Sequence, residues 1–209
     1  MANFLKKLFL VLVGDRFKSQ LGEDNEFRKF SDEELVRLIV LKNNTLLFSI
    51  LYDRYANKIY NKCSGFARSD AEALDLTQDV LLNVFVKLGS FKEKSKFSSW
   101  VYSLTYNFCV NYVNRNKARK IKDKSVPIEQ QEDKLAEKIE DKKLFKLRSE
   151  KLKNALNLID PEDKTILLLK YQDDVSIKEL GVLLEIGESA VKMRLKRARA
   201  RIVETYNSM

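Results

Sequence analysis

The sequence predicts an all-α protein built as two helical domains joined by a linker. Its 209 residues include only six glycines and two prolines, the residues that interrupt helices most strongly. Apolar residues recur at intervals of three and four along most of the chain, which is the helical period. Two Ser-x-x-Glu capping boxes, beginning at Ser31 and Ser176, mark the starts of helices.

Composition favours a polyanionic partner and argues against catalysis. The net charge is +9, so nucleic acid is the first candidate partner and an anionic membrane surface the second. The chain has no histidine, and its only cysteines, Cys63 and Cys109, form no C-x-x-C pair. We expect buried free thiols in a reducing cytoplasm. We predict no catalytic residues, no metal, no cofactor and no small-molecule substrate.

Residues 1–30 are predicted to be an N-terminal extension. The apolar run Leu8–Val13 is too short to cross a bilayer, and no Ala-x-Ala cleavage site follows it. We expect a short amphipathic helix that docks on the protein body or on a partner. Transient membrane contact is the alternative.

A first domain of about four helices is predicted over residues 31–119. Ser31 caps a helix that ends near Leu41, and Thr45 can cap the next one. The second helix has an apolar stripe, expected to be core, made of Phe48, Leu51, Tyr52, Tyr55, Ile59, Cys63 and Phe66.

The third helix, from about Asp70 to Leu88, has two contrasting faces. Its core stripe is Ala73, Thr77, Val80, Leu81, Val84 and Leu88. The opposite face carries Asp75, Asp79, Leu82 and Val86, with Glu72 and Gln78 at its edges. Acids beside exposed apolar groups are typical of a docking surface for a basic partner. A solvated face with two misassigned core residues is the alternative. Gly89 is expected to end the helix at its C′ position.

The loop of residues 89–98 mixes three lysines with Phe91 and Phe97, a combination that suits single-stranded nucleic acid. A helix over about 98–114 follows, with a predicted buried stripe of Val101, Leu104, Phe108 and Tyr112. Its other side shows Trp100, Ser103, Asn107, Asn111 and Asn114. Trp100 can stack on a base and the asparagines can bond to base edges, although Trp100 can also be core.

Charge changes sign in the predicted linker, residues 120–145. Residues 114–125, beginning with Arg115, hold six basic residues against one acidic residue, and residues 126–141 turn acidic. The basic stretch can neutralise phosphates. A solvated basic helix end is the alternative.

The second domain, residues 146–207, is predicted to contain a helix-turn-helix. Asp160 and Pro161 start one helix, Ser176 caps the next, and a basic helix covers about 188–205. The core stripe of this last helix is Val191, Leu195, Ala198 and Ile202. Its outward side carries Ser189, Lys192, Met193, Lys196 and Arg197, flanked by Arg194, Arg199 and Arg201.

Together these segments resemble the sigma-70 family, and most closely its small extracytoplasmic-function (ECF) sigma factors. The residues that resemble region 2 are Leu51-Tyr52-Asp53-Arg54-Tyr55, Asp75-Leu76-Thr77-Gln78-Asp79-Val80, Phe85–Phe91, Phe97–Tyr102, Asn107 and Asn111-Tyr112. The residues that resemble region 4 are Ile177–Leu180 and Ala190–Arg199. The resemblance spans roughly 31–205. Two positions depart from the family pattern, with Glu185 where a turn glycine is common and Gly187 where a capping serine is common.

The resemblance implies a cytoplasmic, non-enzymatic factor that binds core RNA polymerase, directs it to promoter DNA and helps melt the minus-ten element. The implied core-polymerase contacts are Asp75, Gln78, Asp79 and Leu82. The implied minus-ten contacts are Phe91, Lys92, Phe97, Trp100, Ser103, Asn107, Asn111 and Arg115. The implied minus-thirty-five contacts are Ser189, Lys192, Met193, Arg194, Lys196, Arg197 and Arg199. An anti-sigma factor, in many members anchored in the inner membrane, is a further implied partner.

Two other functions are consistent with parts of the chain. A stand-alone helix-turn-helix regulator that binds duplex operator DNA would explain residues 146–207 but not the acidic helix or the loop at 89–98. A basic membrane-surface or RNA-binding adaptor would explain the charge and the N-terminal segment but not the helix-turn-helix.

Overall fold

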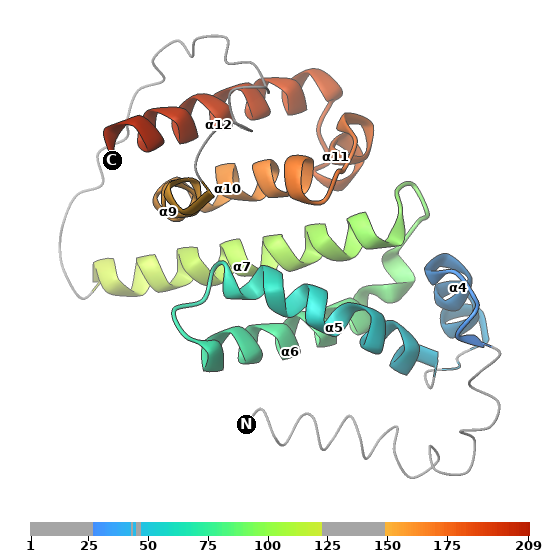
Figure 1. Cartoon of the computed structure of the whole chain (residues 1–209). Helices are drawn as coiled ribbons and strands as arrows, with labels where there is room; N and C mark the ends of the chain where they lie inside the picture. The colour runs from blue at the N-terminus through green and yellow to red at the C-terminus, as the bar shows by residue number, and fades with distance from the viewer. Residues whose placement is uncertain (1–26, 43, 45–46, 123–148) are drawn as a thin grey trace. The chain divides into compact units, whose positions relative to one another are not determined.

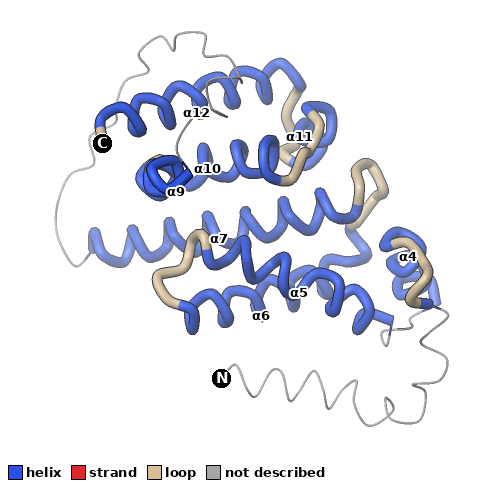
Figure 2. Tube along the Cα trace, in the orientation of Figure 1, coloured by secondary structure: helices blue, strands red, loops and turns tan. Residues whose placement is uncertain are grey.

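The computed structural model describes residues 27–42, 44, 47–122 and 149–209. Every regular element in these ranges is a helix (Figure 2), which confirms the predicted all-α class. None of the described helices combines the length and apolar character that a membrane crossing requires. The predicted N-terminal amphipathic helix, the Thr45 cap and nearly all of the predicted linker lie outside the described residues.

The chain divides into two units, Met1–Thr105 and Tyr106–Met209, with the boundary inside one long helix. The described elements of the first unit are α4 (Asp32–Lys42), α5 (Phe48–Ser64), α6 (Asp70–Lys87), the 3₁₀ turn η2 (Leu88–Ser90) and the start of α7 (Phe97–Lys122) (Figure 1). The predicted capping box at Ser31 is confirmed. Its hydroxyl accepts a bond from the Glu34 N–H at 3.3 Å, and the Glu34 carboxylate accepts one from the Ser31 N–H at 2.7 Å.

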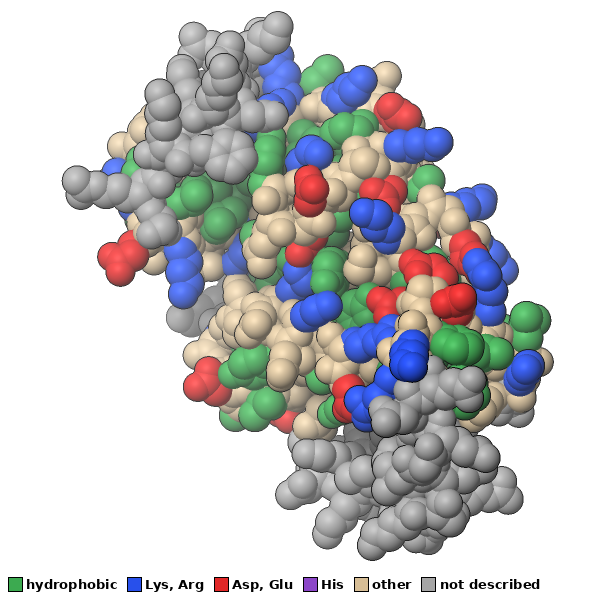
Figure 3. All heavy atoms as spheres, turned by 45° about the vertical axis from the view of Figure 1, so that its right-hand side comes forward, with side chains coloured by type: hydrophobic (Ala, Val, Ile, Leu, Met, Phe, Trp, Pro, Cys, Tyr) green, Lys and Arg blue, Asp and Glu red, His purple; other side chains and the backbone are tan. Residues whose placement is uncertain are grey.

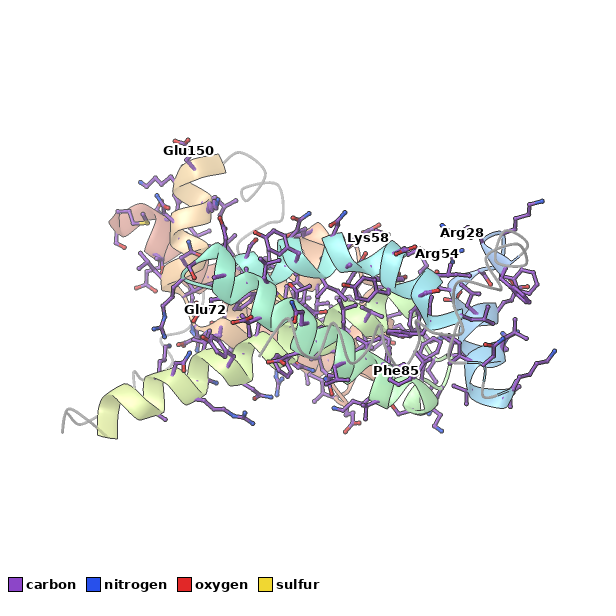
Figure 4. The ribbon with its side chains drawn as sticks, turned by 90° about the horizontal axis from the view of Figure 1, so that it is seen from below. Arg28, Arg54, Lys58, Glu72, Phe85 and Glu150 are labelled. Atoms are coloured by element: carbon purple, nitrogen blue, oxygen red, sulfur yellow. The ribbon has the colours of Figure 1, made fainter. Side chains whose placement is uncertain are left out.

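The core of the first unit is formed by the facing sides of its helices. The predicted core stripe of α6 is buried in full. The predicted α5 stripe is buried at Phe48, Leu51, Tyr55, Ile59 and Cys63, whereas Tyr52 and Phe66 are half-buried. Between α5 and α6, the rings of Phe48 and Phe85 meet edge to face with their centroids 4.9 Å apart. Phe85 is labelled on α6 in Figure 4. Such aromatic contacts add stabilisation beyond the burial of apolar area.

Gly89 stands at the predicted C′ position, directly after the Leu88 C-cap of α6, but it lacks the left-handed conformation that glycine usually adopts there. The helix ends at Lys87 and continues into η2, which contains Gly89, and none of the described glycines has positive φ. The Phe91 N–H donates to the Leu88 carbonyl at 3.1 Å, and the Ser90 hydroxyl donates to the Lys87 carbonyl at 2.7 Å. These bonds use carbonyls at the helix end, so no left-handed residue is required.

The predicted buried stripe of α7 is right at Val101 and wrong at its other three positions, and the helix runs past its predicted end at Asn114 to Lys122. Among the α7 residues whose side chains the structure describes, the buried ones are Phe97, Ser99, Val101, Ser103, Thr105, Tyr106, Cys109 and Val110. Leu104, Phe108 and Tyr112 are only half-buried. Large or apolar residues occupy nearly every side of this helix, so its sequence does not single out one face.

The second unit holds, beyond α7, the elements α9 (Ser149–Leu158), α10 (Pro161–Leu167), the π-helical turn η3 (Leu168–Gln172), α11 (Ile177–Leu183) and α12 (Glu188–Ser208). The predicted core stripe of α12 is buried in full. Pro161 begins α10 as predicted, but the Asp160 side chain makes no capping bond. The predicted capping box of Ser176 and Glu179 is confirmed.

The turn between α11 and α12 is compact and strained at one residue. Gly181 lets the chain turn back closely, because a Cβ there would lie 3.0 Å from the Ile186 carbonyl oxygen. Glu185, which stands where related turns often have glycine, adopts φ 55°. A non-glycine side chain is disfavoured in this left-handed region.

We therefore expect Glu185→Gly to raise the free energy of unfolding by about 1 kcal/mol, because it removes the left-handed strain. Chemical denaturation of both proteins checks this. Glu204→Gly is the matched control, since Glu204 is an exposed position inside α12, where glycine should cost about 1 kcal/mol instead. An equal loss of stability in both variants would contradict the assignment of strain to Glu185.

Candidate polymerase and nucleic-acid interfaces

The outward face of α6 has the predicted composition. Asp75 and Asp79 are exposed, and Gln78 is half-buried at the edge. Leu82 is 44% exposed and Val86 72%. This exposure removes the alternative in which the two apolar residues belong to the core. The face therefore presents two carboxylates beside two apolar side chains.

The electrostatics of this face suit a cationic partner. Partial burial, and secondly the nearby charge of Asp75, raise the pKa of Asp79 above its ordinary value. Among the described residues, neither carboxylate forms an ion pair. An arriving cation would lower the pKa of Asp79 and favour the charged carboxylate. Within the part of the chain that the structure describes, the face is thus acidic and without a compensating charge.

The loop of residues 91–96 leads into an aromatic cluster. The ring of Phe97 lies 5.3 Å from Phe91, 5.5 Å from Tyr55 and 5.6 Å from Trp100, measured between centroids. Phe97 is 0% exposed and Phe91 9%. The prediction that both phenylalanines offer free stacking surfaces is therefore wrong, because their rings fill the core beneath the loop. Trp100 is half-buried and lies at the edge of the cluster.

The predicted hydrogen-bonding face of α7 is mostly exposed. Asn107, Asn111 and Arg115 are exposed along the helix, and Lys92 is exposed on the loop that precedes it. Ser103 is the exception, since it is only 4% exposed and cannot offer its hydroxyl to a partner in this conformation. It lies on the buried arc with Val110, two helical turns further on.

The outward face of α12 is basic. The predicted contact residues that are exposed are Ser189, Lys192, Met193, Arg194 and Arg197, whereas Lys196 and Arg199 are half-buried. Arg201 forms an ion pair with Asp163 of α10 at 2.7 Å, so its side chain stabilises the second unit. A basic, exposed second helix after a tight turn is the arrangement with which helix-turn-helix proteins enter the major groove.

Sequence reasoning missed the contacts of α4 with the loop. Arg37 forms a two-point ion pair with Glu93, at 2.7 Å and 2.5 Å, and the Phe97 N–H donates to the Glu33 carboxylate at 2.8 Å. Both pairs join residues more than fifty positions apart. No local pattern could indicate them, because helical periodicity and capping boxes report only neighbours of a few residues.

Comparison with known families gives two matches. The family model described as sigma-70 region 2 matches residues 51–119, and that described as sigma-70 region 4 matches residues 149–202. Together the matches cover more than half of the chain. They lie within the predicted domains 31–119 and 146–207, whose limits stay a prediction.

Curated relatives are named as ECF sigma factors. The ECF RNA polymerase sigma factor SigW of Bacillus subtilis is 26% identical over 166 residues, which covers 77% of this chain and 89% of the relative. The ECF RNA polymerase sigma-E factor of Escherichia coli K12 is 24% identical over 180 residues, covering 83% of this chain and 93% of the relative.

Two solved structures share the fold. One is the sigma factor RpoE of Bartonella quintana in complex with the anti-sigma factor NepR, with a TM-score of 0.54 and 21% identity, covering 77% of this chain and 96% of that one. The other is CnrH in complex with the cytosolic domain of CnrY, with a TM-score of 0.56 and 17% identity, covering 85% and 97%. From the matched regions and the named relatives, the chain belongs to the ECF sigma factors of the sigma-70 family, which are non-enzymatic subunits for transcription initiation.

Proposed function

We propose that this sigma factor docks on a basic surface of core RNA polymerase through α6, captures the melted minus-ten strand with α7 and its preceding loop, and reads the minus-thirty-five element with α12. It acts in the cytoplasm, where the polymerase and the promoters are. The polymerase supplies the chemistry of RNA synthesis, and this chain supplies promoter choice and help with strand opening.

The observation that carries the proposal is the exposed face of α6. A stand-alone operator-binding protein would not need two exposed carboxylates beside exposed Leu82 and Val86. A partner that buries the apolar side chains and supplies cations to Asp75 and Asp79 would gain both hydrophobic and charge-pair free energy. Gln78 at the edge would add a hydrogen bond.

Minus-ten capture is assigned to the residues that solvent reaches. Trp100, at the edge of the aromatic cluster, would stack on an unpaired base. Asn107 and Asn111 would bond to base edges, while Lys92 and Arg115 would contact phosphates. The buried rings of Phe91 and Phe97 would pack against Trp100 and hold it in place rather than touch the DNA strand. The buried Ser103 makes no DNA contact in this assignment.

Minus-thirty-five reading is assigned to the exposed side of α12. Ser189, Lys192 and Met193 lie near its N-terminus, where a recognition helix meets base edges. Lys196, one turn further along, would read a base with them. Arg194 and Arg197 would hold the phosphate backbone, with Arg199 reaching it from a less exposed position. Six positive charges and no negative one between residues 192 and 201 favour this contact.

An anti-sigma factor is the proposed regulatory partner. Two structures of the same fold, RpoE and CnrH, are complexes with NepR and with the cytosolic domain of CnrY, respectively. We extend the proposal to a partner anchored in the inner membrane, whose cytosolic part would hold this chain away from the polymerase. Release of the chain would then start transcription.

Replacement of Asn107 by alanine tests the minus-ten assignment. We expect Asn107→Ala to weaken binding of the reconstituted holoenzyme to fork-junction DNA by roughly tenfold, since a base contact is worth about 1–3 kcal/mol. Affinity for core polymerase should not change. Asn57→Ala is the matched control, because Asn57 is an exposed asparagine on α5. Equal fork-junction affinity of wild type and Asn107→Ala would refute the role of Asn107.

A further inference from the structure

Helix α4 contacts the loop that precedes α7 at two points. Its Arg37 guanidinium bonds to Glu93 through two nitrogens, with Nε 2.7 Å from Oε1 and Nη2 2.5 Å from Oε2. One turn earlier, the Glu33 carboxylate accepts the Phe97 N–H at 2.8 Å, at the first residue of α7. A carboxylate at a helix N-terminus satisfies a free amide and favours the helix dipole. The loop of residues 91–96 is thus held in its middle and at its end.

The held loop has no regular structure of its own. Residues 91–96 form neither helix nor strand (Figure 2). Glu93 sits at φ 55°, a backbone conformation that a side-chain-bearing residue rarely adopts unless other contacts hold it. The two-point bond from Arg37 is a contact of this kind. Without it, we expect Glu93 to leave the left-handed region and the loop to sample other shapes.

The Arg37–Glu93 pair also sets the charge of the loop. Glu93 lies between Lys92 and Lys94, which are both exposed, so its carboxylate would oppose a phosphate drawn to the lysines. The bond from Arg37 holds the pKa of Glu93 below its ordinary value, and the same bond raises the pKa of Arg37. Both groups therefore stay charged and paired at neutral pH. On the face seen in Figure 3, acidic and basic side chains likewise lie beside one another.

The helix that makes these contacts is itself fixed to α5. Asp32 at the start of α4 pairs with Arg54 at 2.5 Å and accepts a bond from the Tyr55 hydroxyl. Arg54, labelled in Figure 4, also donates to the carbonyls of Arg28 and Phe30 at 2.8 Å each. Leu35, Val36 and Ile39 of α4 are buried. An element this well anchored can hold a loop in one place.

We propose that α4 is a positioning element for promoter melting. Its Arg37 forms the two-point ion pair with Glu93 and so fixes the loop of residues 91–96 in the conformation that receives the unpaired minus-ten strand. This inference rests on the proposed function. It goes further by giving a role to α4, which precedes the family match that begins at residue 51. Arg37 and Glu93 act through the loop and do not touch DNA.

The test compares variants of the pair in fork-junction binding by the reconstituted holoenzyme. The probes are fork-junction fragments built from a set of genomic upstream sequences. Arg37→Ala should weaken binding by about fivefold, the upper end expected for an exposed ion pair. Glu93→Asn should weaken it similarly, although it makes the chain more positive, because asparagine tolerates positive φ but cannot accept the two-point bond. The charge-reversed double variant Arg37→Glu with Glu93→Arg should restore most of the affinity.

Arg28→Ala is the matched control. Arg28 is an exposed arginine that pairs with Asp53 at 3.5 Å, so its removal changes the net charge equally without touching the loop. We expect no change in fork-junction binding from it. Core affinity should be unchanged in all variants, and each should melt cooperatively within a few degrees of the wild type, because one exposed ion pair is worth at most about 1 kcal/mol. Amide hydrogen exchange at residues 92–97 should become faster in Arg37→Ala but not in Arg28→Ala.

Different results would overturn the positioning role of α4 and the proposed function of the chain. Tighter binding by Glu93→Asn would show that only charge matters and would overturn the positioning role. Equal binding by wild type and Arg37→Ala would overturn it too. Failure of the wild-type holoenzyme to bind any fragment would overturn the proposed function, and this inference with it.

Discussion

Asp79→Lys should lower the affinity of the chain for core RNA polymerase by roughly a hundredfold while leaving the fold intact. Asp79 lies on the exposed face of α6, where burial and the charge of Asp75 already raise its pKa. A basic partner that relieves this repulsion would meet a like charge instead, and reversing one member of a close charge pair costs several kcal/mol. Titration of labelled chain with core polymerase measures the loss.

The control for this variant is Glu204→Lys. Glu204 is an exposed acid on α12, so the substitution makes the same change in net charge on the other unit. We expect its core affinity to equal that of the wild type. Asp75→Lys should behave like Asp79→Lys. Unchanged core affinity in Asp79→Lys, with a normal melting temperature, would remove α6 from the docking surface.

Phe97→Ala should lower the free energy of unfolding by about 3–5 kcal/mol, the usual cost of emptying a buried phenylalanine site. Phe97 is 0% exposed and contacts the rings of Tyr55, Phe91 and Trp100. Denaturation followed by tryptophan fluorescence is a direct readout, because Trp100 is the only tryptophan in the chain and stacks on Phe97.

A pair of leucine variants separates packing from base stacking. Phe97→Leu keeps most of the apolar volume and should cost about 1–2 kcal/mol of stability, with little effect on fork-junction binding. Trp100→Leu should weaken that binding about tenfold, since stacking on an aromatic ring is worth about 1–3 kcal/mol per base. A larger loss of fork-junction binding for Phe97→Leu than for Trp100→Leu would show that Phe97, and not Trp100, is the residue that stacks on a base.

Local patterns predicted the fold class and much of the helical detail. The α6 and α12 core stripes were correct because each helix has one continuous apolar stripe at the helical period, although α6 also carries Leu82 and Val86 on its outward face. The capping boxes at Ser31 and Ser176 were correct because both partners lie within one turn. Such features depend on neighbours in the sequence alone.

The errors occurred where tertiary packing decides the outcome. The loop phenylalanines read as surface groups because lysines surround them, yet their rings turn inward onto Tyr55 and Trp100. The sequence of α7 has apolar residues on several faces, so it did not determine which face of the helix is buried. The ion pair of Arg37 with Glu93 joins residues 56 positions apart, so only the folded structure reveals it. The roles of the contact residues stay predictions.

Run-off transcription on genomic upstream fragments, with and without core polymerase, tests the central claim most directly. We predict specific transcripts only when core and this chain are both present, lost with Asp79→Lys and kept with Glu204→Lys. The start sites would locate the minus-ten and minus-thirty-five elements. Tight, sequence-specific binding of duplex DNA by the chain alone, with no transcript when core is added, would contradict the account.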